Sequence, residues 1–278
     1  MTEAWNDDLL KDPHAVQDKR RRVRDMFAAI APKYDLNNRL HSFGRDQAWR
    51  RKAVKLAELK PSDIVVDVAC GTGDLTLAFY DTLLMCRSRA ERKLNSPEPF
   101  QILGVDFTFE MLPPASAKAA SSHFGIHLGC EYKRFGEERG KRLPFLNGDA
   151  TALPLADASA DIVSIAFGIR NVQQPMLALR EFFRVLRPGG RVIVLEFSQP
   201  KNRLIRWAND LYCAKIMPHT ATWISGDKSG AYKYLPMSVK TFMNRETMMQ
   251  MMRDAGFVDV TQHPMTFGVC VCYRGFKR

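Results

Sequence analysis

The 278-residue sequence lacks any long apolar run, and no stretch approaches the roughly 20 consecutive apolar residues of a membrane-crossing helix. Its first residues, MTEAWNDDLLKDPHAV, contain acidic side chains and no apolar core, so they match neither a secretory signal nor a mitochondrial transit peptide. Hydrophobic residues nevertheless make up 46% of the chain, which is enough to build a substantial core. We therefore expect a folded protein of the cytoplasm.

Cysteine is scarce, and no two of the six cysteines have the spacing of a CxxC pair. A chain of this length does not depend on disulfides, so we expect reduced thiols. Cys270 and Cys272 lie two residues apart in a strand-like run and therefore share a face. They are interpreted as core residues, with a pair of metal ligands as the less favoured alternative. No metal site is predicted elsewhere.

Acidic residues are too few to balance the basic ones, and the net charge is +11. The excess of Lys and Arg lies in residues 1–60 and 191–278, while residues 61–190 are nearly neutral. Basic flanks suit an anionic partner, either nucleic acid or a membrane surface, but they also serve solubility alone.

The sequence does contain a repeated alternation of short β-branched runs and amphipathic stretches. Strands are predicted at 63–69, 100–106, 142–150, 160–168 and 191–198, and helices between them at 73–85, 107–124 and 173–190. Helices at 18–31 and 46–59 precede this core, and a helix at 245–257 and a hairpin at 258–276 follow it. Such alternation indicates an α/β fold, with a mainly parallel sheet covered by helices on both faces.

The stretch VVDVACGTGDLTLAF (65–79) runs from a predicted strand through Gly71-Thr72-Gly73 into a predicted helix. A phosphate-binding loop would need Lys followed by Ser or Thr after its second glycine, and that pair is missing. A dinucleotide fingerprint would need a third glycine where Thr76 stands. These absences argue against both common phosphate sites, and the two glycines could also form no more than a tight turn.

Two further loops narrow the choice of ligand. Asp106 ends the second strand, where a carboxylate can accept hydrogen bonds from both hydroxyls of a ribose. Asp149-Ala150 follow the third strand, where an acidic group and a backbone N–H can hold an adenine edge. In an open α/β sheet these loops converge outside the carboxyl ends of the strands. The set fits an adenosine without a pyrophosphate, as in S-adenosylmethionine, although Asp106 could instead only cap a helix.

Seven segments, in order along most of the chain, match a known family. They are VRDMFAAIAPKYDLNNRL, DVACGTGDL, GVDFTFEML, ALPLADASADIVSIAFGIRNV, ALREFFRVLRPGGRVIVLEFSQP, ISGDKSGAYKYLPMSV and MMRDAGFVDVTQHPMTFG. The chain resembles the class I S-adenosylmethionine-dependent methyltransferases and, among them, the C-methyltransferases of ubiquinone and menaquinone biosynthesis. It departs from the family in a longer polar excursion at 86–99 and in Ala166, where some members have Ser.

The resemblance implies a three-layer, Rossmann-like fold with a seven-stranded sheet whose last strand is antiparallel. It implies S-adenosylmethionine as cofactor and methyl transfer to a ring carbon of a polyprenylated quinol. The preferred substrate is demethylmenaquinol. The alternatives are 2-polyprenyl-6-methoxy-1,4-benzoquinol or both quinols. The residues assigned to the cofactor are Thr72, Asp106, Asp149 and Ala150, together with the turn glycines Gly71 and Gly73.

Methylation of a quinol ring requires an electron-rich carbon, which forms when a ring hydroxyl loses its proton. Arg170 and Asn171, in FGIRN, follow the fourth strand and are expected to face the substrate. The resemblance places Arg170 in proton removal, but a guanidinium is not deprotonated in proteins. We predict that Arg170 stabilises the phenolate or orders a water, with a salt bridge to an acidic neighbour as the alternative. Tyr34 is predicted to cover the cofactor or bind the quinol, or only to pack the N-terminal helix, and His219 is a minor candidate base.

A polyprenyl substrate lies in a bilayer, so we expect a peripheral contact with an anionic membrane surface. The basic stretch 19–24 and the arginines Arg203 and Arg206 near Trp207 are candidates for it, and a solvated charged face is the alternative. Nucleic acid is not expected, because the chain has no NPPY-type base-flipping motif. A homodimer, and a catalytically silent scaffold of a quinone-synthesis complex, stay open.

We expect a single methyltransferase domain with four segments. They are an N-terminal helical cap (1–60), a cofactor-binding core (61–198), an insertion that covers the substrate as a lid (199–240), and a C-terminal helix and hairpin (241–278).

Overall fold

The structure, a computed structural model, describes residues 5–6, 8–90, 101–121, 143–217, 220, 222 and 230–278. His219 and residues 91–99 of the polar excursion lie outside the described residues. Among the helices that the structure describes, none combines the length and the apolar character that crossing a bilayer requires.

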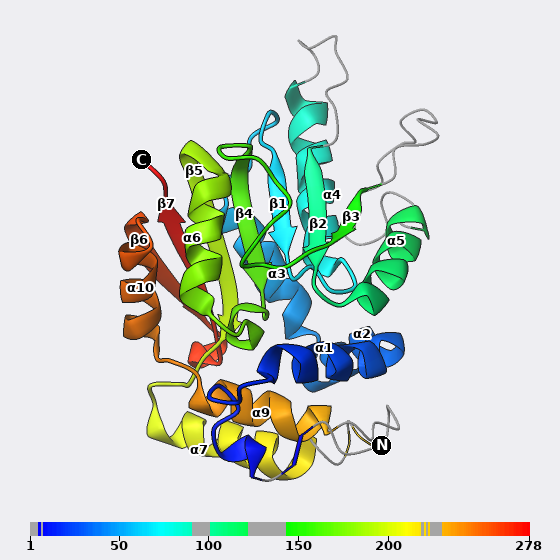
Figure 1. The fold of residues 1–278 in the computed structure, drawn as a ribbon, viewed down its shortest axis with the longest axis vertical. Coiled ribbons are helices and arrows are strands. Elements are labelled where there is room, and N and C mark those ends of the chain that lie inside the picture. Colours follow the sequence, from blue (N-terminus) through cyan, green and yellow to red (C-terminus); the bar gives the residue numbers. More distant parts are fainter. Residues whose placement is uncertain are drawn as a thin grey trace.

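Seven strands form one sheet in the order β3-β2-β1-β4-β5-β7-β6 (Figure 1). They are β1 (Val65–Val68), β2 (Ile102–Asp106), β3 (Phe145–Asn147), β4 (Ala160–Ala166), β5 (Leu186–Phe197), β6 (Val258–Met265) and β7 (Cys270–Phe276). Neighbouring strands from β3 to β5 are parallel, and β7 runs antiparallel to both β5 and β6. The predicted sheet, mainly parallel with an antiparallel last strand, is confirmed.

The sheet is the middle layer of three (Figure 1). Helices α6 (Pro175–Val185) and α10 (Arg245–Asp254) pack on one face, and α3 (Arg45–Leu56) and α4 (Asp74–Ala90) pack on the other. A further helix, α5 (Leu112–Ser121), lies beside the edge strand β3. The inner strands β1, β2 and β4 are almost wholly buried, whereas the edge strands β3 and β6 are partly exposed. Burial on both faces explains why the inner strands are rich in Val and Ile and lack regular polar alternation.

The strand β7 shows how successive residues serve opposite faces. Cys270 and Cys272 are fully buried in the core under α3 and α4, whereas Val271 and Tyr273 belong to the core under α6 and α10. The core-packing interpretation of the two cysteines is therefore confirmed.

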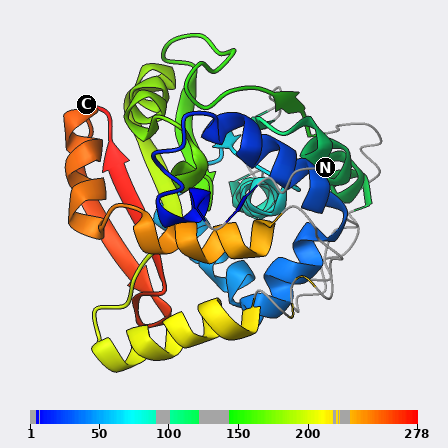
Figure 2. The same ribbon diagram turned by 60° about the horizontal axis from the view of Figure 1, so that its bottom comes forward.

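A third group of helices lies across the carboxyl ends of the parallel strands (Figure 2). It consists of α1 (Lys19–Ile30), α2 (Tyr34–His41), α7 (Arg203–Leu211) with the π-helical turn Tyr212–Ile216, and α9 (Ala231–Thr241). Trp5, Met26 and Tyr234 belong to a separate buried cluster that joins α1 to α9. The site residues that follow the strands therefore lie under these helices.

Two local expectations change. The helix expected over 173–190 ends at Val185, because Leu186 is already extended and Arg187 precedes Pro188, which disfavours helical backbone. Residues 186–190 instead belong to β5. The segment 199–240, expected only as an insertion, is mostly helical in its described part.

Candidate functional site

The glycine turn between β1 and α4 requires left-handed backbone. Gly71 and Gly73 have φ values of 55° and 84°, which glycine adopts without strain. The backbone N–H of Gly71 donates to Oδ2 of Asp106 at 2.7 Å. The turn after the first strand and the carboxylate that ends the second strand are thus joined directly.

A cavity of about 260 Å³ lies at the carboxyl ends of β1, β2 and β4. This is close to the lower end of pockets that hold small ligands, about 300–1,000 Å³. Six of the predicted site residues line it, namely Tyr34, Gly71, Asp106, Asp149, Ala150 and Asn171. Thr72, Gly73 and Arg170 do not line it. Apolar side chains of α1, Val23 and Phe27, form part of the wall, which the sequence did not indicate.

Asp106 is a buried carboxylate that can accept more hydrogen bonds than the protein supplies. Its Oδ1 accepts the N–H of Thr108 at 2.8 Å and its Oδ2 accepts the N–H of Gly71. Burial raises the pKa of Asp106 to about 6, although both backbone bonds act in the opposite direction. Each carboxylate oxygen has a further lone pair, so the group can accept hydrogen bonds from a ligand in the cavity.

Asp149 lines the cavity and pairs with Arg20, which the sequence analysis assigned to a basic surface. Its Oδ1 accepts the N–H and the hydroxyl of Thr151, both at 2.9 Å, and its Oδ2 lies 2.6 Å from Nη2 of Arg20. The guanidinium of Arg20 also stands 4.6 Å above the ring of Phe107. Helix α1 is therefore held over the cavity by an ion pair and a cation–π contact.

Thr72 lines a small recess of about 20 Å³ that shares Tyr34, Gly71 and Ala166 with the main cavity. Its hydroxyl donates to Oδ1 of Asp35 at 2.5 Å. The recess also holds Asp67, whose pKa burial raises to about 6, because the hydrogen bonds from Thr76 and Ser164 offset that burial only in part.

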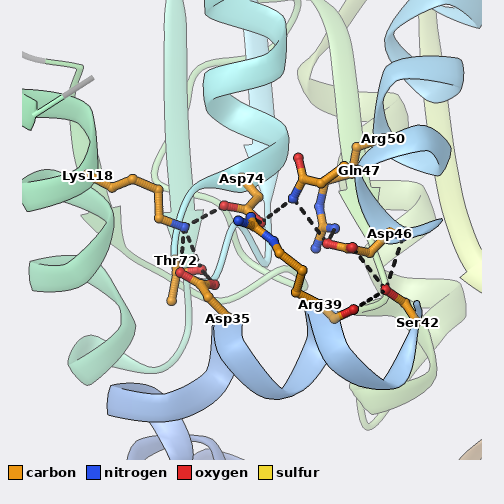
Figure 3. A network of polar contacts seen from close by, with 9 residues as sticks. All are labelled: Asp35, Arg39, Ser42, Asp46, Gln47, Arg50, Thr72, Asp74 and Lys118. Atoms are coloured by element: carbon orange, nitrogen blue, oxygen red, sulfur yellow. Dashed lines mark hydrogen bonds and ion pairs between the residues drawn. The ribbon is translucent and has the colours of Figure 1, made fainter. Parts of the chain in front are cut away.

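An ionic network surrounds this recess (Figure 3). Lys118 of α5 lies 2.7 Å from Asp35 of α2 and 2.5 Å from Asp74 of α4. Burial tends to raise the pKa of Asp74, but Arg50 and Lys118 outweigh it and the pKa is lowered. Gln47 of α3 also donates to Asp74, so the network joins four helices, α2, α3, α4 and α5, around Thr72.

Arg170 is turned away from the cavity and is engaged in buried contacts. Its Nη1 donates to Oε1 of Glu196 at 2.6 Å and to the carbonyl of Phe167 at 2.7 Å, and its Nε donates to Oγ of Ser238 at 3.3 Å. Arg170 therefore forms the salt bridge to an acidic neighbour, Glu196, that was the alternative prediction. Its catalytic assignment stays a prediction.

Asn171 does face the cavity, and a second tyrosine orients it. The hydroxyl of Tyr234 donates to Oδ1 of Asn171 at 3.0 Å, and Nδ2 of Asn171 donates to the carbonyl of Phe167 at 3.2 Å. Tyr34 reaches both the cavity and the recess, and burial raises its pKa, so it stays protonated at neutral pH. Tyr234 is itself fully buried and packs α9 against α1 and the segment around Trp5.

Lys19 is a buried lysine that sequence reasoning assigned to a basic surface. Its Nζ donates to the carbonyls of Arg170 and Val172 at 2.8 and 2.9 Å and lies 3.2 Å from Nδ1 of His14. Burial lowers the pKa of Lys19 to about 8. The prediction that Lys19 belongs to a charged surface is therefore wrong, since Lys19 is buried and holds the loop that carries Asn171. The arginines of the run 19–24 include exposed ones, so their surface role stays a prediction.

Comparison of the sequence with known families finds one that covers nearly the whole chain. The ubiE/COQ5 methyltransferase family matches residues 15–277. A demethylmenaquinone methyltransferase of Thermus thermophilus is 41% identical over 90% of the chain and 99% of that protein. A ubiquinone/menaquinone biosynthesis C-methyltransferase of Geobacter sulfurreducens is 37% identical over 95% of the chain and 91% of that protein. A mitochondrial 2-methoxy-6-polyprenyl-1,4-benzoquinol methylase of Dictyostelium discoideum is 34% identical over 94% and 83%.

Solved structures share the fold at low sequence identity. A SAM-dependent methyltransferase of Thermotoga maritima matches with a TM-score of 0.55 and 21% identity, over 92% of this chain and 100% of that one. A SAM-dependent methyltransferase of Aquifex aeolicus matches with a TM-score of 0.54 and 16% identity, over 88% and 98%.

Proposed function

The chain belongs to the ubiE/COQ5 methyltransferase family, and on that premise we propose that it transfers a methyl group from S-adenosylmethionine to a ring carbon of a polyprenylated quinol. Demethylmenaquinol is the proposed substrate, because the 41% identical relative is named for that reaction. The observation that carries the proposal is the cavity beside the glycine turn, lined by a buried carboxylate, Asp106, and by apolar side chains of α1.

The family implies S-adenosylmethionine, and the residues at the cavity fit it. The free lone pairs of Asp106 suit the ribose hydroxyls, and Asp149 with the backbone N–H of Ala150 suits an adenine edge. We assign Thr72, in the recess beside Gly71, to the amino-acid end of the cofactor. The sulfonium makes the methyl group electrophilic when the cofactor is bound, so the protein has chiefly to align the two reactants.

The remaining wall suits the quinol ring. Val23, Phe27 and Phe167 present apolar surface, and a dry site favours a reaction in which the charges of sulfonium and phenolate cancel. Asn171 and Tyr34 are the groups that we assign to the reacting hydroxyl. The protonated Tyr34 can donate a hydrogen bond to the oxygen as negative charge develops on it.

Arg170 acts in this scheme as a positioning residue. Its charge is paired with Glu196, and its bond to the carbonyl of Phe167 fixes the loop that ends in Asn171. This differs from direct stabilisation of the phenolate, which would require the guanidinium to reach the cavity.

A polyprenyl tail places the substrate in a bilayer, so the proposed function includes peripheral contact with a membrane, at its cytoplasmic side. Lys19 is buried, and the exposed Arg20, Arg21 and Arg24 pair with Asp149, Asp18 and Asp25. Because these pairs reduce the positive charge of the run, we look for the contact on another surface as well.

The ubiquinone precursor 2-polyprenyl-6-methoxy-1,4-benzoquinol is a second candidate substrate. The Dictyostelium relative, 34% identical over 94% of the chain, is named for a reaction on such a ring. Both quinols place a reactive ring carbon beside a hydroxyl, so one cavity can serve both.

The direct test is transfer of labelled methyl from S-adenosylmethionine to each reduced quinol in lipid vesicles. The matched variants are Asp106→Asn and, as control, Asp161→Asn, whose carboxylate pairs with Arg187 at the opposite end of β4. Wild type and the control are expected to label demethylmenaquinol. Asp106→Asn is expected to weaken cofactor binding about 10- to 100-fold, because hydrogen bonds to a charged group contribute about 1.5–3 kcal/mol.

Titration calorimetry at two pH values tests whether the charged form of Asp106 binds the cofactor. The raised pKa of Asp106, about 6, means that the carboxylate is mostly protonated at pH 5, so wild-type affinity should fall between pH 7.5 and 5. The fall should be smaller in Asp106→Asn. Labelling of neither quinol by a wild type that binds the cofactor would overturn the proposed function and favour the scaffold.

A further inference from the structure

Helix α7 turns its apolar face to solvent. Leu204, Trp207 and Leu211 lie at i, i+3 and i+7, and so share one stripe of the helix. Leu204 is 72% exposed and Trp207 63% exposed, and no residue of α7 is buried. A surface helix ordinarily directs such a stripe to the core. In α7 the apolar stripe instead points away from the protein.

The side that α7 presents to the protein is partly polar. Ile205, Arg206 and Asn209 are only half-buried there, and Nε of Arg206 donates to the carbonyl of Pro200 at 2.9 Å. The side chain of Asn202 caps the helix by accepting the N–H groups of Leu204 and Ile205. The helix is therefore well formed and anchored, and its outward stripe is not the result of a frayed end.

Further exposed apolar residues lie on α2 and in the turn that follows it. Leu36 and Leu40, one turn apart on α2, are 54% and 48% exposed, and Phe43, in the turn after α2, is 77% exposed. The rings of Phe43 and Tyr212, which follows α7 directly, lie 5.6 Å apart, and the hydroxyl of Tyr212 donates to the carbonyl of His41 at 3.3 Å. We call the six residues Leu36, Leu40, Phe43, Leu204, Trp207 and Leu211 the apolar face.

Basic residues outnumber acidic ones in the segment that contains α7. Residues 199–217 contain Lys201, Arg203, Arg206 and Lys215 but Asp210 as their only acid. Lys201 pairs with Glu246 and Arg206 is half-buried, so the exposed Arg203 and Lys215 are the cations that flank the helix. In Figures 1 and 2, α7 and α2 lie on the side of the molecule where the parallel strands end, the side that also holds the cavity. A hydrophobic stripe with flanking cations is the pattern by which helices lie in the plane of an anionic bilayer interface.

We infer that the apolar face is a docking surface for an anionic lipid bilayer, with α7 lying in the interface and its flanking cations at the headgroups. The surface itself is independent of the proposed function, but its use, to bring the cavity to a lipid-borne quinol, rests on that function. An exposed tryptophan and leucines lose their contact with water there, and Arg203 gains anionic neighbours.

A second copy of the chain fits this face less well. A twofold contact would bring the same basic cluster of both copies together, and like charges repel across such an interface. A bilayer with anionic headgroups has the complementary charge over the whole area. The same cations that oppose self-association thus favour lipid.

Vesicle co-sedimentation without quinol or cofactor tests the inference. The test variant is Leu204→Gln/Trp207→Gln, and the matched control is Leu177→Gln, an exposed leucine of α6, which lies apart from α7 in both views (Figures 1 and 2). Wild type and control should bind phosphatidylglycerol-containing vesicles, more weakly as salt rises. The double variant should bind at least about tenfold more weakly, from the loss of two buried apolar groups.

Wild type, double variant and control are also compared in two further assays, thermal unfolding and methyl transfer to a short-tailed, water-soluble quinol. If the double variant is folded, its unfolding temperature and its transfer rate should equal those of the wild type. Equal vesicle binding by wild type and the double variant, or no binding by wild type, would overturn the inference. So would a wild-type dimer in sedimentation that the double variant converts to monomer, because a second copy would then cover the face. Failure of methyl transfer in every protein, with vesicle binding intact, would instead overturn only the proposed function.

Discussion

The buried pair of Arg170 and Glu196 allows a sharp test of the site's architecture by the substitution Glu196→Gln. The side chains are 3% and 2% exposed, and Nη1 of Arg170 lies 2.6 Å from Oε1 of Glu196. Glutamine keeps the shape of the side chain but removes its charge. The guanidinium then stays buried with neutral acceptors alone: the amide oxygen of the glutamine, the carbonyl of Phe167 and the hydroxyl of Ser238.

The expected loss of stability is large because the remaining charge is desolvated. Breaking a buried ion pair by removal of one partner costs about 3–5 kcal/mol, whereas exposed pairs contribute little. Glu196 also accepts the backbone N–H of Phe197 at 2.8 Å, so the substitution disturbs the end of β5 as well. We therefore expect a fall of about 3–5 kcal/mol in the free energy of unfolding.

Urea unfolding followed by circular dichroism measures this change. Glu246→Gln is the matched control, because Glu246 pairs with Lys201 at the surface at 3.2 Å and its loss should change stability very little. The double variant Arg170→Met/Glu196→Leu should recover much of the stability, since it removes both charges. A loss in Glu196→Gln no greater than in Glu246→Gln would refute the argument that the pair is desolvated and structural.

Two other predictions concern groups that support the same loop. The pKa of Lys19 is lowered to about 8, so the native state holds this proton more weakly than the unfolded chain does. The free energy of unfolding of the wild type should therefore rise between pH 8 and 10, by up to about 1.4 kcal/mol per pH unit. The rise is measured relative to Lys19→Met, which lacks the titrating group. Urea unfolding of both proteins across that range checks this, and a constant difference would contradict it. Tyr234→Phe removes the hydrogen bond to Asn171 and should lower kcat about 5- to 10-fold, the effect of about 1 kcal/mol. Cofactor affinity, measured alongside, should not change, and an equal loss in both would indicate general damage instead.

Residues that directly follow a strand were the ones that the sequence located well. Gly71 and Asp149 come shortly after β1 and β3, and Asp106 is the last residue of β2; parallel strands bring those positions to one edge of the sheet. The order of β-branched runs was enough to predict this, because chain direction alone decides which end of each strand the loops share.

Arg170 shows the limit of that reasoning. It also follows a strand, yet its guanidinium lies away from the cavity, because Glu196 on β5 offers a buried counter-charge. The two residues are 26 positions apart, and no local pattern of the sequence connects them. The direction of a long side chain depends on such distant partners.

The sequence by itself determined the sheet, the glycine turn and the carboxylates that line the cavity, since these follow from periodicity and chain order. Only the tertiary structure decided that Lys19 is buried, that Arg20 pairs with Asp149 beside the cavity, and that α7 turns its apolar stripe outward. A periodic pattern defines which residues share one face of a helix. Which way that face turns is set by what the rest of the chain packs against it, and this is a property of the folded molecule.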